Sequence, residues 1–290
     1  MKCIGVLVIM MCLLGSVTTI SAVDFTDMIG VSSTAKGFAV TAEQNNIDAS
    51  LKNPAALGIM RRIHFKTSYG SLFDSAYYTA NLSIGIPINT NWSAALQVPT
   101  KRIQDIPLSV NQGGQGVAIG SFNDSETVAN FTLSHRIGIL TLGAAANYRS
   151  RELYTATAQG VGFDGGLMLA TGPLTVGASI RNIGKTTLTW STGTTETIQE
   201  QYNVGIAYQL MPMVKLLADT TLGTTTETNL GTVFSLNPSL RFLAGIHDVT
   251  SSKQLALGTE LELDRLTVSF SYQTHDELGT SYKVGVSYAY

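Results

Sequence analysis

Apolar and polar residues alternate with a period of two from about Ile63 to the C-terminus, which places successive side chains on opposite faces of a strand. The last segment shows this most clearly, because tyrosine and valine occupy every second position from Tyr282 to Tyr290, with small or polar residues between them. Further segments with the same pattern begin near Tyr78, Leu140, Leu174, Tyr202, Leu255 and Leu266. The pattern predicts an all-β chain.

Short turn signals separate these segments. Asn89-Thr90-Asn91 and Asn237-Pro238-Ser239 are typical hairpin connections, so we expect antiparallel neighbours. With the weaker segments included, the barrel domain, residues 63–290, should hold about fourteen strands. With an even number, the first strand starts and the last strand ends on the same side of a membrane. The longest connection, Gln104 to Glu126, contains Gly113-Gly114-Gln115-Gly116 and is expected to be a flexible external loop.

Two architectures have such alternation, a soluble β-sandwich or lipocalin-like barrel and an outer-membrane barrel with the apolar face outward. The membrane form is favoured because only 13% of residues are charged while 44% are hydrophobic, and because the chain ends on an aromatic strand. The polar face carries scattered single charges that suit a crowded lumen, at Lys66, Asp164, Arg181, Lys215, Asp219, Glu260 and Lys283. Aromatic residues near strand ends suit an interfacial girdle, at Tyr69, Tyr77, Trp92, Tyr148, Trp190, Tyr208, Tyr282 and Tyr288.

The N-terminus has the pattern of a secretory signal peptide. A lysine precedes an apolar run from Ile4 to Gly15, which is too short to span a bilayer as a helix, and cleavage is expected after Ala22. An uncleaved anchor is the alternative. Both cysteines, Cys3 and Cys12, lie in residues 1–22, so the mature chain would have no disulfide.

One Ala-rich stretch before the first strand breaks the alternation: Asp48-Ala49-Ser50, followed by Asn53-Pro54-Ala55-Ala56-Leu57. With the upstream Phe38 to Gln44 and the downstream Leu174 to Gly184, it resembles the PorV/PorQ-like outer-membrane proteins, distant relatives of the FadL long-chain fatty acid transporters. The acidic part of the motif departs from the family pattern, because Asn45-Asn46-Ile47 interrupts it.

The resemblance implies a fourteen-stranded barrel whose lumen is plugged by an N-terminal hatch, here residues 23–62. Asp48, Ala49, Ser50, Asn53, Pro54 and Ala55 would then be its structural or gating motif. The residues themselves allow a helical turn from Asp48 to Leu51 and bias Asn53 out of a helix because it precedes Pro54. An exposed linker is the alternative.

Candidate chemistry is sparse. The net charge of -2 argues against a nucleic-acid partner. His64, His135, His247 and His275 lie far apart in the sequence, so we predict no catalytic residue, no metal site and no cofactor, and no enzyme. Gly160 to Gly165 matches a dinucleotide fingerprint by letter, but a strand pattern rather than a helix follows it.

Three functions remain open at this stage. The first is a passive conduit in the outer membrane of a Gram-negative bacterium, with outer-membrane lipid around it and hydrophobic or small amphipathic molecules as ligands. In FadL relatives a kinked strand opens a lateral exit, and Pro99 could mark an equivalent kink in this wall. The second is a non-transporting, PorV-like accessory for secreted proteins or surface attachment. An outer-membrane lipid hydrolase is the third and least favoured.

Overall fold

The wall of the molecule is one antiparallel β-sheet that closes on itself. The computed structural model describes residues 25–58, 60–113, 115–251 and 253–290, and in it β16 pairs with β1 to complete the ring. Of the sixteen strands in the described residues, two form a side hairpin and fourteen form the wall. The predicted fourteen-stranded antiparallel barrel is therefore confirmed.

Each wall strand is hydrogen-bonded to the next wall strand along the chain. They are β1 (His64–Leu72), β2 (Tyr77–Pro87), β3 (Trp92–Gln112), β4 (Gln115–Ile137), β5 (Leu140–Leu153), β6 (Ala156–Thr171), β7 (Leu174–Arg181), β10 (Gln201–Met211), β11 (Val214–Leu222), β12 (Thr226–Asn237), β13 (Leu240–His247), β14 (Gln254–Leu263), β15 (Leu266–His275) and β16 (Gly279–Ala289).

The barrel is apolar on its outside and polar on its inside. In β16, Tyr282, Val284 and Val286 are 42–46% exposed, whereas Ser281 and Lys283, at the alternate positions, are each 2% exposed. The same inversion holds in β14, where Leu255 and Leu257 are exposed and Ala256 is buried. A barrel with lipid outside and a filled lumen has this arrangement, and a soluble barrel has the opposite one.

The aromatic girdle is only partly as predicted. Six of the eight expected residues point outward and are 36–48% exposed: Tyr69, Trp92, Tyr148, Tyr208, Tyr282 and Tyr288. Tyr77 was wrongly assigned, because it faces the lumen at 8% exposure and donates a hydrogen bond to Asp27. Trp190 is also outside the wall, in the side hairpin.

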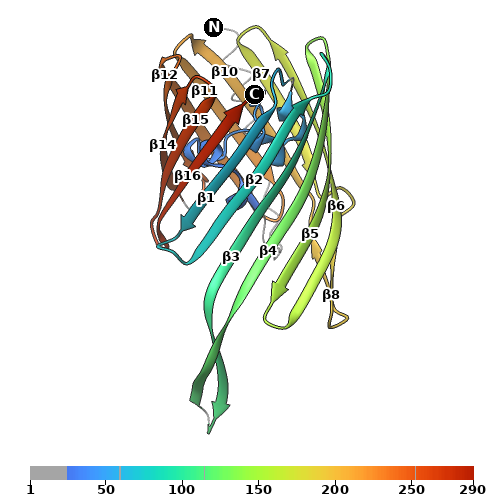
Figure 1. Ribbon diagram of the computed structural model, residues 1–290, viewed down its shortest axis with the longest axis vertical. Helices are drawn as coiled ribbons and strands as arrows, with labels where there is room; N and C mark the ends of the chain where they lie inside the picture. The colour runs from blue at the N-terminus through green and yellow to red at the C-terminus, as the bar shows by residue number, and fades with distance from the viewer. Residues whose placement is uncertain (1–24, 59, 114, 252) are drawn as a thin grey trace.

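The two ends of the barrel differ. At one, called the short-turn end, tight turns such as 138–139 and 212–213 join the strands, and Ile63 is hydrogen-bonded to Tyr290. At the other, called the ribbon end, β3 and β4 continue past the wall as a twisted two-stranded ribbon (Figure 1). The expected loop from Gln104 to Glu126 is therefore wrong. Its residues are paired as far as Gln112 and Gln115, and a bulge after Ile103 had interrupted the alternation.

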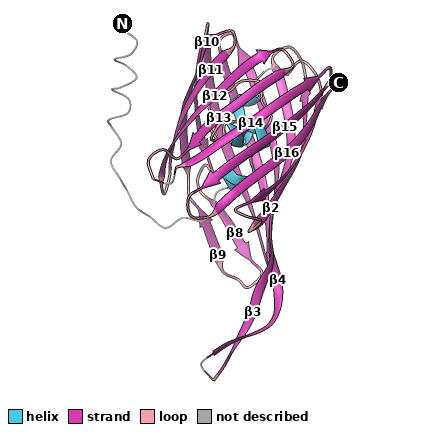
Figure 2. Ribbon diagram, turned by 90° about the vertical axis from the view of Figure 1, so that its left-hand side faces the viewer, coloured by secondary structure: helices cyan, strands magenta, loops and turns pink. Residues whose placement is uncertain are grey.

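The N-terminal segment lies inside the ring of strands, where Figure 2 shows its helical turns in cyan. It contains η1 (Phe25–Met28), α2 (Val31–Ala35), η2 (Asp48–Leu51) and η3 (Pro54–Leu57). Because α2 contacts β13 to β16 while η3 contacts β3 to β6, the segment bridges opposite sides of the lumen. Asp27 contacts Tyr77 at the ribbon end and Met60 contacts Ser93 at the short-turn end, so the N-terminal segment runs the length of the lumen.

The side hairpin, β8 (Thr186–Trp190) and β9 (Thr195–Ile198), folds against the luminal face of β6. A Cβ built on Gly162 would lie 2.3 Å from the Thr186 hydroxyl, and one on Gly160 would lie 2.4 Å from the Thr187 carbonyl oxygen. These glycines of the fingerprint-like stretch therefore permit β8 to pack on the strand. Leu188 and Ile198 of the hairpin bury Ala158.

The expected signal peptide, residues 1–22, lies outside the described residues. No helix in the part of the chain that the structure describes has the length and hydropathy needed to cross a membrane.

Candidate functional site

The candidate site is the contact between the barrel wall and the hatch, meaning the described residues 25–58 and 60–62. Its centre is the motif around Asn53. Asn53 has extended backbone geometry (φ -136°, ψ 108°), and its side-chain oxygen accepts a hydrogen bond from Ala55 N while Pro54 begins the helical turn η3. This is an N-cap, in which the side chain satisfies a backbone donor that the turn leaves unpaired.

The Asn53 amide also joins the hatch to itself and to the wall. Its Nδ2 donates to Thr41 O at 2.7 Å and to Leu167 O of β6 at 3.3 Å. Because Asn53 is 0% exposed, bulk water cannot take the place of these hydrogen-bond partners. The side chain therefore has three structural partners, and any change in it affects both the turn and the docking of the hatch.

Glycines in the wall let the hatch backbone approach the strands. A Cβ on Gly143 of β5 would lie 2.2 Å from Ala55 N, and one on Gly166 of β6 would lie 2.0 Å from the Asn53 side-chain oxygen. Both distances are far shorter than a carbon contact permits. The small residues of the motif and the glycines of the wall are thus complementary surfaces.

Asp48 opens the motif and forms an ion pair with the wall. Its carboxylate lies 2.5 Å from Lys66 Nζ of β1, and Asp48 itself is 1% exposed. It also packs against Gly30, where an added Cβ would lie 2.0 Å from the carboxylate. Two residues further, Ser50 accepts a hydrogen bond from Gln97 of β3 at 2.9 Å. The acidic and hydroxyl residues of the motif therefore face β1 and β3.

A single carboxylate on the opposite wall holds the middle of the hatch. Asp219 Oδ2 of β11 accepts hydrogen bonds from Val40 N and Thr41 N, both at 2.8 Å, and from Thr41 Oγ1 at 2.7 Å. Lys52 Nζ lies 3.2 Å from the same oxygen and donates to Phe38 O at 2.9 Å. Asp219 and Lys52 are 2% and 3% exposed, so both charges lie in a nearly dry contact.

A third ion pair stabilises the hatch internally. Lys36 Nζ lies 2.5 Å from Glu43 Oε2, and Lys36 is 1% exposed. Gly37 follows with φ +59°, and a Cβ there would lie 2.6 Å from the Ile246 backbone of β13. Glycine is required at this position because both the positive φ and the close approach exclude a side chain.

The rest of the luminal wall carries a row of buried amides and acids. Asn130 donates to Asn147, and Asn147 donates to Asp164, which in turn accepts from the backbone N of Asn182. All are at most 4% exposed. The row continues the polar lining from β4 to the end of β7.

In this conformation the hatch fills the lumen. Val31, Ala39, Val40, Ala49 and Leu57 are all 0% exposed. At the ribbon end, a cavity of about 60 Å³ remains among charged residues, lined by Lys101, Ile103, Asp124, Glu126 and Arg151. That volume suits a couple of water molecules and not a hydrocarbon of useful size.

Pro99 lies on β3 with its side chain buried toward the lumen. The pairing of β3 with β2 is continuous here, with Pro99 opposite Asn81. On the other side, the pairing with β4 passes from Gln97 to Thr100 without pairs at Val98 and Pro99, and the register is the same before and after. The ladder is thus interrupted on one side at the residue singled out from the sequence.

The histidines do not come together. His64 lies in β1 at the short-turn end, His135 stacks on Trp92 with ring centroids 4.2 Å apart, and His247 contacts Asn229. Within the described ranges, no group of three or more histidine, cysteine or acidic residues is placed to hold a metal ion. Several charged groups of the lumen, Asp219, Lys66 and Lys283, are instead engaged in contacts with the hatch.

No family model and no curated protein matches the sequence. Among solved structures, the chain is similar to the Pseudomonas putida toluene transporter TodX, with TM-score 0.65 and 14% identity over 95% of this chain and 99% of that one. A TodX monoaromatic hydrocarbon channel with the deltaS2 mutation gives 0.65 and 14% over 90% and 98%. A Pseudomonas aeruginosa FadL homologue gives 0.63 and 10% over 89% and 98%.

The chain shares their fold. At 10–14% identity, the likeness is one of barrel architecture.

Several of those contacts were not predicted as such. Asp219, Lys66 and Lys283 were recognised as single charges on polar faces, but their hatch partners were not. The available signal was the isolation of each charge among small residues, since an isolated charge in a crowded lumen needs a partner from elsewhere. Lys52, inside the hatch, gave the complementary signal for Asp219.

Proposed function

We propose that the protein is an integral barrel of the bacterial outer membrane that is exported by a cleaved signal peptide and admits hydrophobic or small amphipathic molecules when its hatch moves. The observation that carries the proposal is the hatch itself. It is a separate segment that fills the lumen and is held to the wall by a few polar anchors, chiefly those of Asp219 and Asn53.

The surface and the fold support the same function. Apolar side chains cover the outside of the strands, as lipid contact requires. Short turns are characteristic of the periplasmic side of such barrels, so the ribbon end would face the cell exterior. The similar structures are named a toluene transporter and a monoaromatic hydrocarbon channel, and we extend the class of apolar cargo from them to this chain.

The interruption at Val98 and Pro99 offers a lateral route as part of the proposal. Pro99 has no N–H to contribute to the ladder, so strand separation on its β4 side breaks fewer hydrogen bonds than elsewhere. A cargo released beside the hatch would leave between β3 and β4 into the surrounding lipid. Replacing Pro99 with Val, which restores a donor at this position, should then slow uptake without changing the amount of folded barrel.

Uptake measured in cells tests the function directly. A Gram-negative host without its own fatty acid or hydrocarbon channel would express the full chain, and entry of labelled toluene and of a labelled long-chain fatty acid would be timed. We expect faster entry than with an unrelated barrel of equal abundance, and still faster entry with Asp219→Ala. Equal rates for the full chain and the unrelated barrel would refute the conduit.

One observation favours a second candidate, a PorV-like accessory for secreted proteins or surface attachment. The ribbon from 106 to 122 has no charged residue, and Val110, Val117 and Ile119 on it are 36–57% exposed. Such a projection could contact another protein. Affinity purification of the full chain, with and without residues 106–122, separates the two functions. Only an accessory should lose a stoichiometric partner when the ribbon is removed. Uptake of apolar molecules should stay unchanged by the same deletion.

A further inference from the structure

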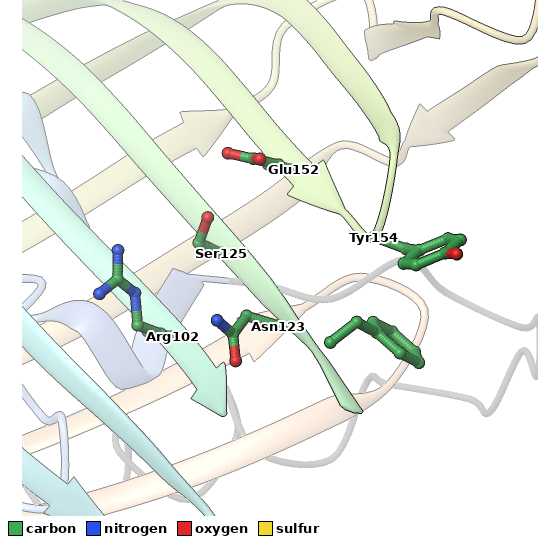
Figure 3. A pocket seen from close by; sticks show the side chains of 6 residues that line it. Arg102, Asn123, Ser125, Glu152 and Tyr154 are labelled. Atoms are coloured by element: carbon green, nitrogen blue, oxygen red, sulfur yellow. The ribbon is translucent and has the colours of Figure 1, made fainter. Parts of the chain in front are cut away.

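A concave site lies on the outer surface of the wall where the ribbon leaves the barrel. Its volume is about 290 Å³, and it is lined by Arg102, Phe122, Asn123, Ser125, Glu152 and Tyr154. Figure 3 shows these side chains, contributed by β3, by β4 and by the end of β5 with its turn. Pockets for small molecules begin at about 300 Å³, so this site suits a ligand of the size of one sugar ring.

Two opposite charges flank the centre of the site. Arg102 pairs with Ser125, and Ser125 pairs with Glu152, so the guanidinium and the carboxylate come from the strands on either side of β4. Within the part of the chain that the structure describes, neither charged side chain has a hydrogen bond or an ion pair. The site thus offers strong donors and strong acceptors but has no net charge. A free anion meets the carboxylate and a free cation meets the guanidinium, so neither is attracted overall.

Two uncharged polar side chains lie beside these charges. Asn123 Oδ1 accepts a hydrogen bond from Asp105 N at 3.2 Å, which holds the amide in place and leaves its Nδ2 as a donor for a ligand. The Ser125 hydroxyl can both donate and accept. A ligand that satisfies the whole set must carry several groups that each donate and accept. Hydroxyl groups have this property, whereas phosphate oxygens only accept and ammonium groups only donate.

Aromatic rings form one end of the site. Phe122 and Tyr154 meet edge to face with ring centroids 5.5 Å apart. Tyr154 has φ +55°, an unfavourable conformation for a side chain of this size, and its N–H donates to Asn123 O at 3.3 Å. Residues in such conformations are concentrated at ligand sites. The rings add apolar surface to the polar row, so the site suits a ligand with C–H groups as well as hydroxyl groups.

The site lies where the apolar outer surface ends. Along β4 from Ser125 toward the short-turn end, the next outward residues are Thr127, Ala129 and Phe131, of which Phe131 is 52% exposed. Tyr148, 45% exposed, stands beside Ala129 in the adjacent strand. The outer face therefore changes within two rows from charged to apolar, as a barrel does at the level of the head groups. In the orientation proposed above, these are the head groups of the outer leaflet, which in an outer membrane are the sugars of lipopolysaccharide.

We propose that this site binds one neutral pyranose ring of a cell-surface glycan. The Arg102 guanidinium donates to hydroxyl oxygens of the sugar, the Glu152 carboxylate accepts from its hydroxyl groups, and Asn123 and Ser125 complete the set. The C–H face of the ring packs on the aromatic end of the site. Lipopolysaccharide and a soluble glycan are two sources of the same chemistry. The ligand class rests on the side chains of the site, and only the lipopolysaccharide source rests on the proposed orientation.

Ligand-observed NMR on the purified full chain tests the site. The chain would be placed in nanodiscs of phosphatidylcholine, which carry no sugar. The probes are the methyl glycosides of glucose, galactose, mannose and N-acetylglucosamine, and the lipopolysaccharide core oligosaccharide released from its lipid. We expect at least one glycoside to bind with a Kd of about 1–10 mM, as suits a small neutral ligand, and inorganic phosphate and ethanolamine to bind at least about tenfold more weakly.

The core oligosaccharide distinguishes the two sources of the sugar. If it binds more than about tenfold tighter than the best glycoside, contacts beyond one ring contribute and lipopolysaccharide is the source. If it binds no tighter than the glycoside, the source is a soluble glycan. Either result supports sugar binding at this site.

Variants locate the binding. Arg102→Ala and Glu152→Ala should each weaken binding of the best glycoside about tenfold. Lys185→Ala and Glu277→Ala are the matched controls and should leave it unchanged, because both residues are exposed at the ribbon end outside the site. Tyr154→Gly removes the ring but suits the positive φ, so it should keep the turn and weaken binding about tenfold. The shift of the unheated barrel on a denaturing gel shows that each variant is folded.

Three results would overturn the proposal. They are the absence of binding by all five sugar probes, binding that is unchanged in both Arg102→Ala and Glu152→Ala, and binding of phosphate or ethanolamine as tight as that of the best glycoside. The last result would mean that the site selects charge and not hydroxyl groups. Sugar binding is measured on the purified chain without uptake, so failure of the conduit and failure of this site are separately visible.

Discussion

Removal of the Asp219 carboxylate should release the middle of the hatch while leaving the barrel closed. In Asp219→Ala, Val40 N and Thr41 N lose their shared acceptor, and Lys52 loses the only carboxylate within 4 Å among the described residues. The wall around position 219 keeps its backbone pairing with β10 and β12, because strand hydrogen bonds do not involve the side chain.

The size of the effect follows from these contacts. Leaving two buried N–H donors without an acceptor costs about 1–3 kcal/mol each. Separating a buried ion pair costs about 3–5 kcal/mol, and the lower figure applies because Lys52 keeps its bond to Phe38 O. Water entering the vacated space offsets part of the total. We therefore expect the docked hatch to lose about 5 kcal/mol, equivalent to a factor of more than about 10³ in its docking equilibrium.

Hydrogen exchange measured by mass spectrometry reports the docking equilibrium of the hatch separately for each peptide of the chain. Peptides covering residues 38–44 should exchange about 10³ times faster in Asp219→Ala than in the unmodified chain. Peptides from β16, on the other side of the barrel, should keep their rates and serve as the internal control. Thr41→Val removes only the hydroxyl contact and should change the rate by about tenfold or less.

A double-mutant cycle separates the ion pair from the backbone contacts. Lys52→Met keeps the length of the stem and removes the charge, so Asp219→Ala combined with Lys52→Met should cost at least about 2 kcal/mol less than the sum of the single changes. If exchange of residues 38–44 in Asp219→Ala stays within about tenfold of the unmodified chain, or if the two changes are additive, the anchoring role of Asp219 is wrong.

Three further changes test other parts of the structure. Gly143→Ala places a methyl group 2.2 Å from Ala55 N, so exchange in the hatch should rise by an amount equivalent to about 1–3 kcal/mol of overpacking, with little change in heat stability of the barrel. Asn53→Ala removes the cap and two donated bonds and should destabilise the docked hatch by about 2 kcal/mol, whereas Asn89→Ala in an exposed turn should cost under about 1 kcal/mol. The backbone and hydroxyl hydrogen bonds from the start of β16 hold the pKa of Asp74, in the β1–β2 turn, below its ordinary value. This turn should therefore be most stable above about pH 4 and open as the pH falls through that lowered pKa, as read by NMR titration.

Each of these has an outcome that contradicts it. Unchanged hatch exchange in Gly143→Ala would mean that the wall tolerates a side chain there. Equal effects of the two asparagine changes would remove any special role for the motif. For Asp74, a titration at the ordinary carboxylate pKa would show that the turn bonds do not form in the folded chain.

The order of apolar and polar residues was enough to predict the strands and their two faces. In β16, alternation alone places Tyr282 and Val284 on the face opposite Ser281 and Lys283, because a strand has a period of two whatever surrounds it. The low charge and the small residues of the polar face favoured an outward apolar face, as the structure has it. The helical turn at Asp48 and the extended Asn53 are likewise local properties of their neighbours.

The sequence was insufficient where the partner lies far along the chain. Asp219 and Val40 are 179 positions apart, and nothing in the chain between them indicates that the two meet in the lumen. Tyr77 was expected to face outward because it is an aromatic residue near a strand end, yet it shares a face with the inward Thr79 and Asn81 and donates a hydrogen bond to Asp27. The ribbon was missed for a different reason, since the bulge after Ile103 shifts the alternation and hides a continuous pair of strands.

The sequence by itself therefore determined the strands, their alternating faces and the presence of a distinct segment before the first strand, because these depend on periodicity and on residue type. Only the tertiary structure decided which wall charges hold that segment and where glycines admit its backbone. These contacts form when the sheet closes around the segment, and closure depends on strand register, which the local pattern of residues does not encode.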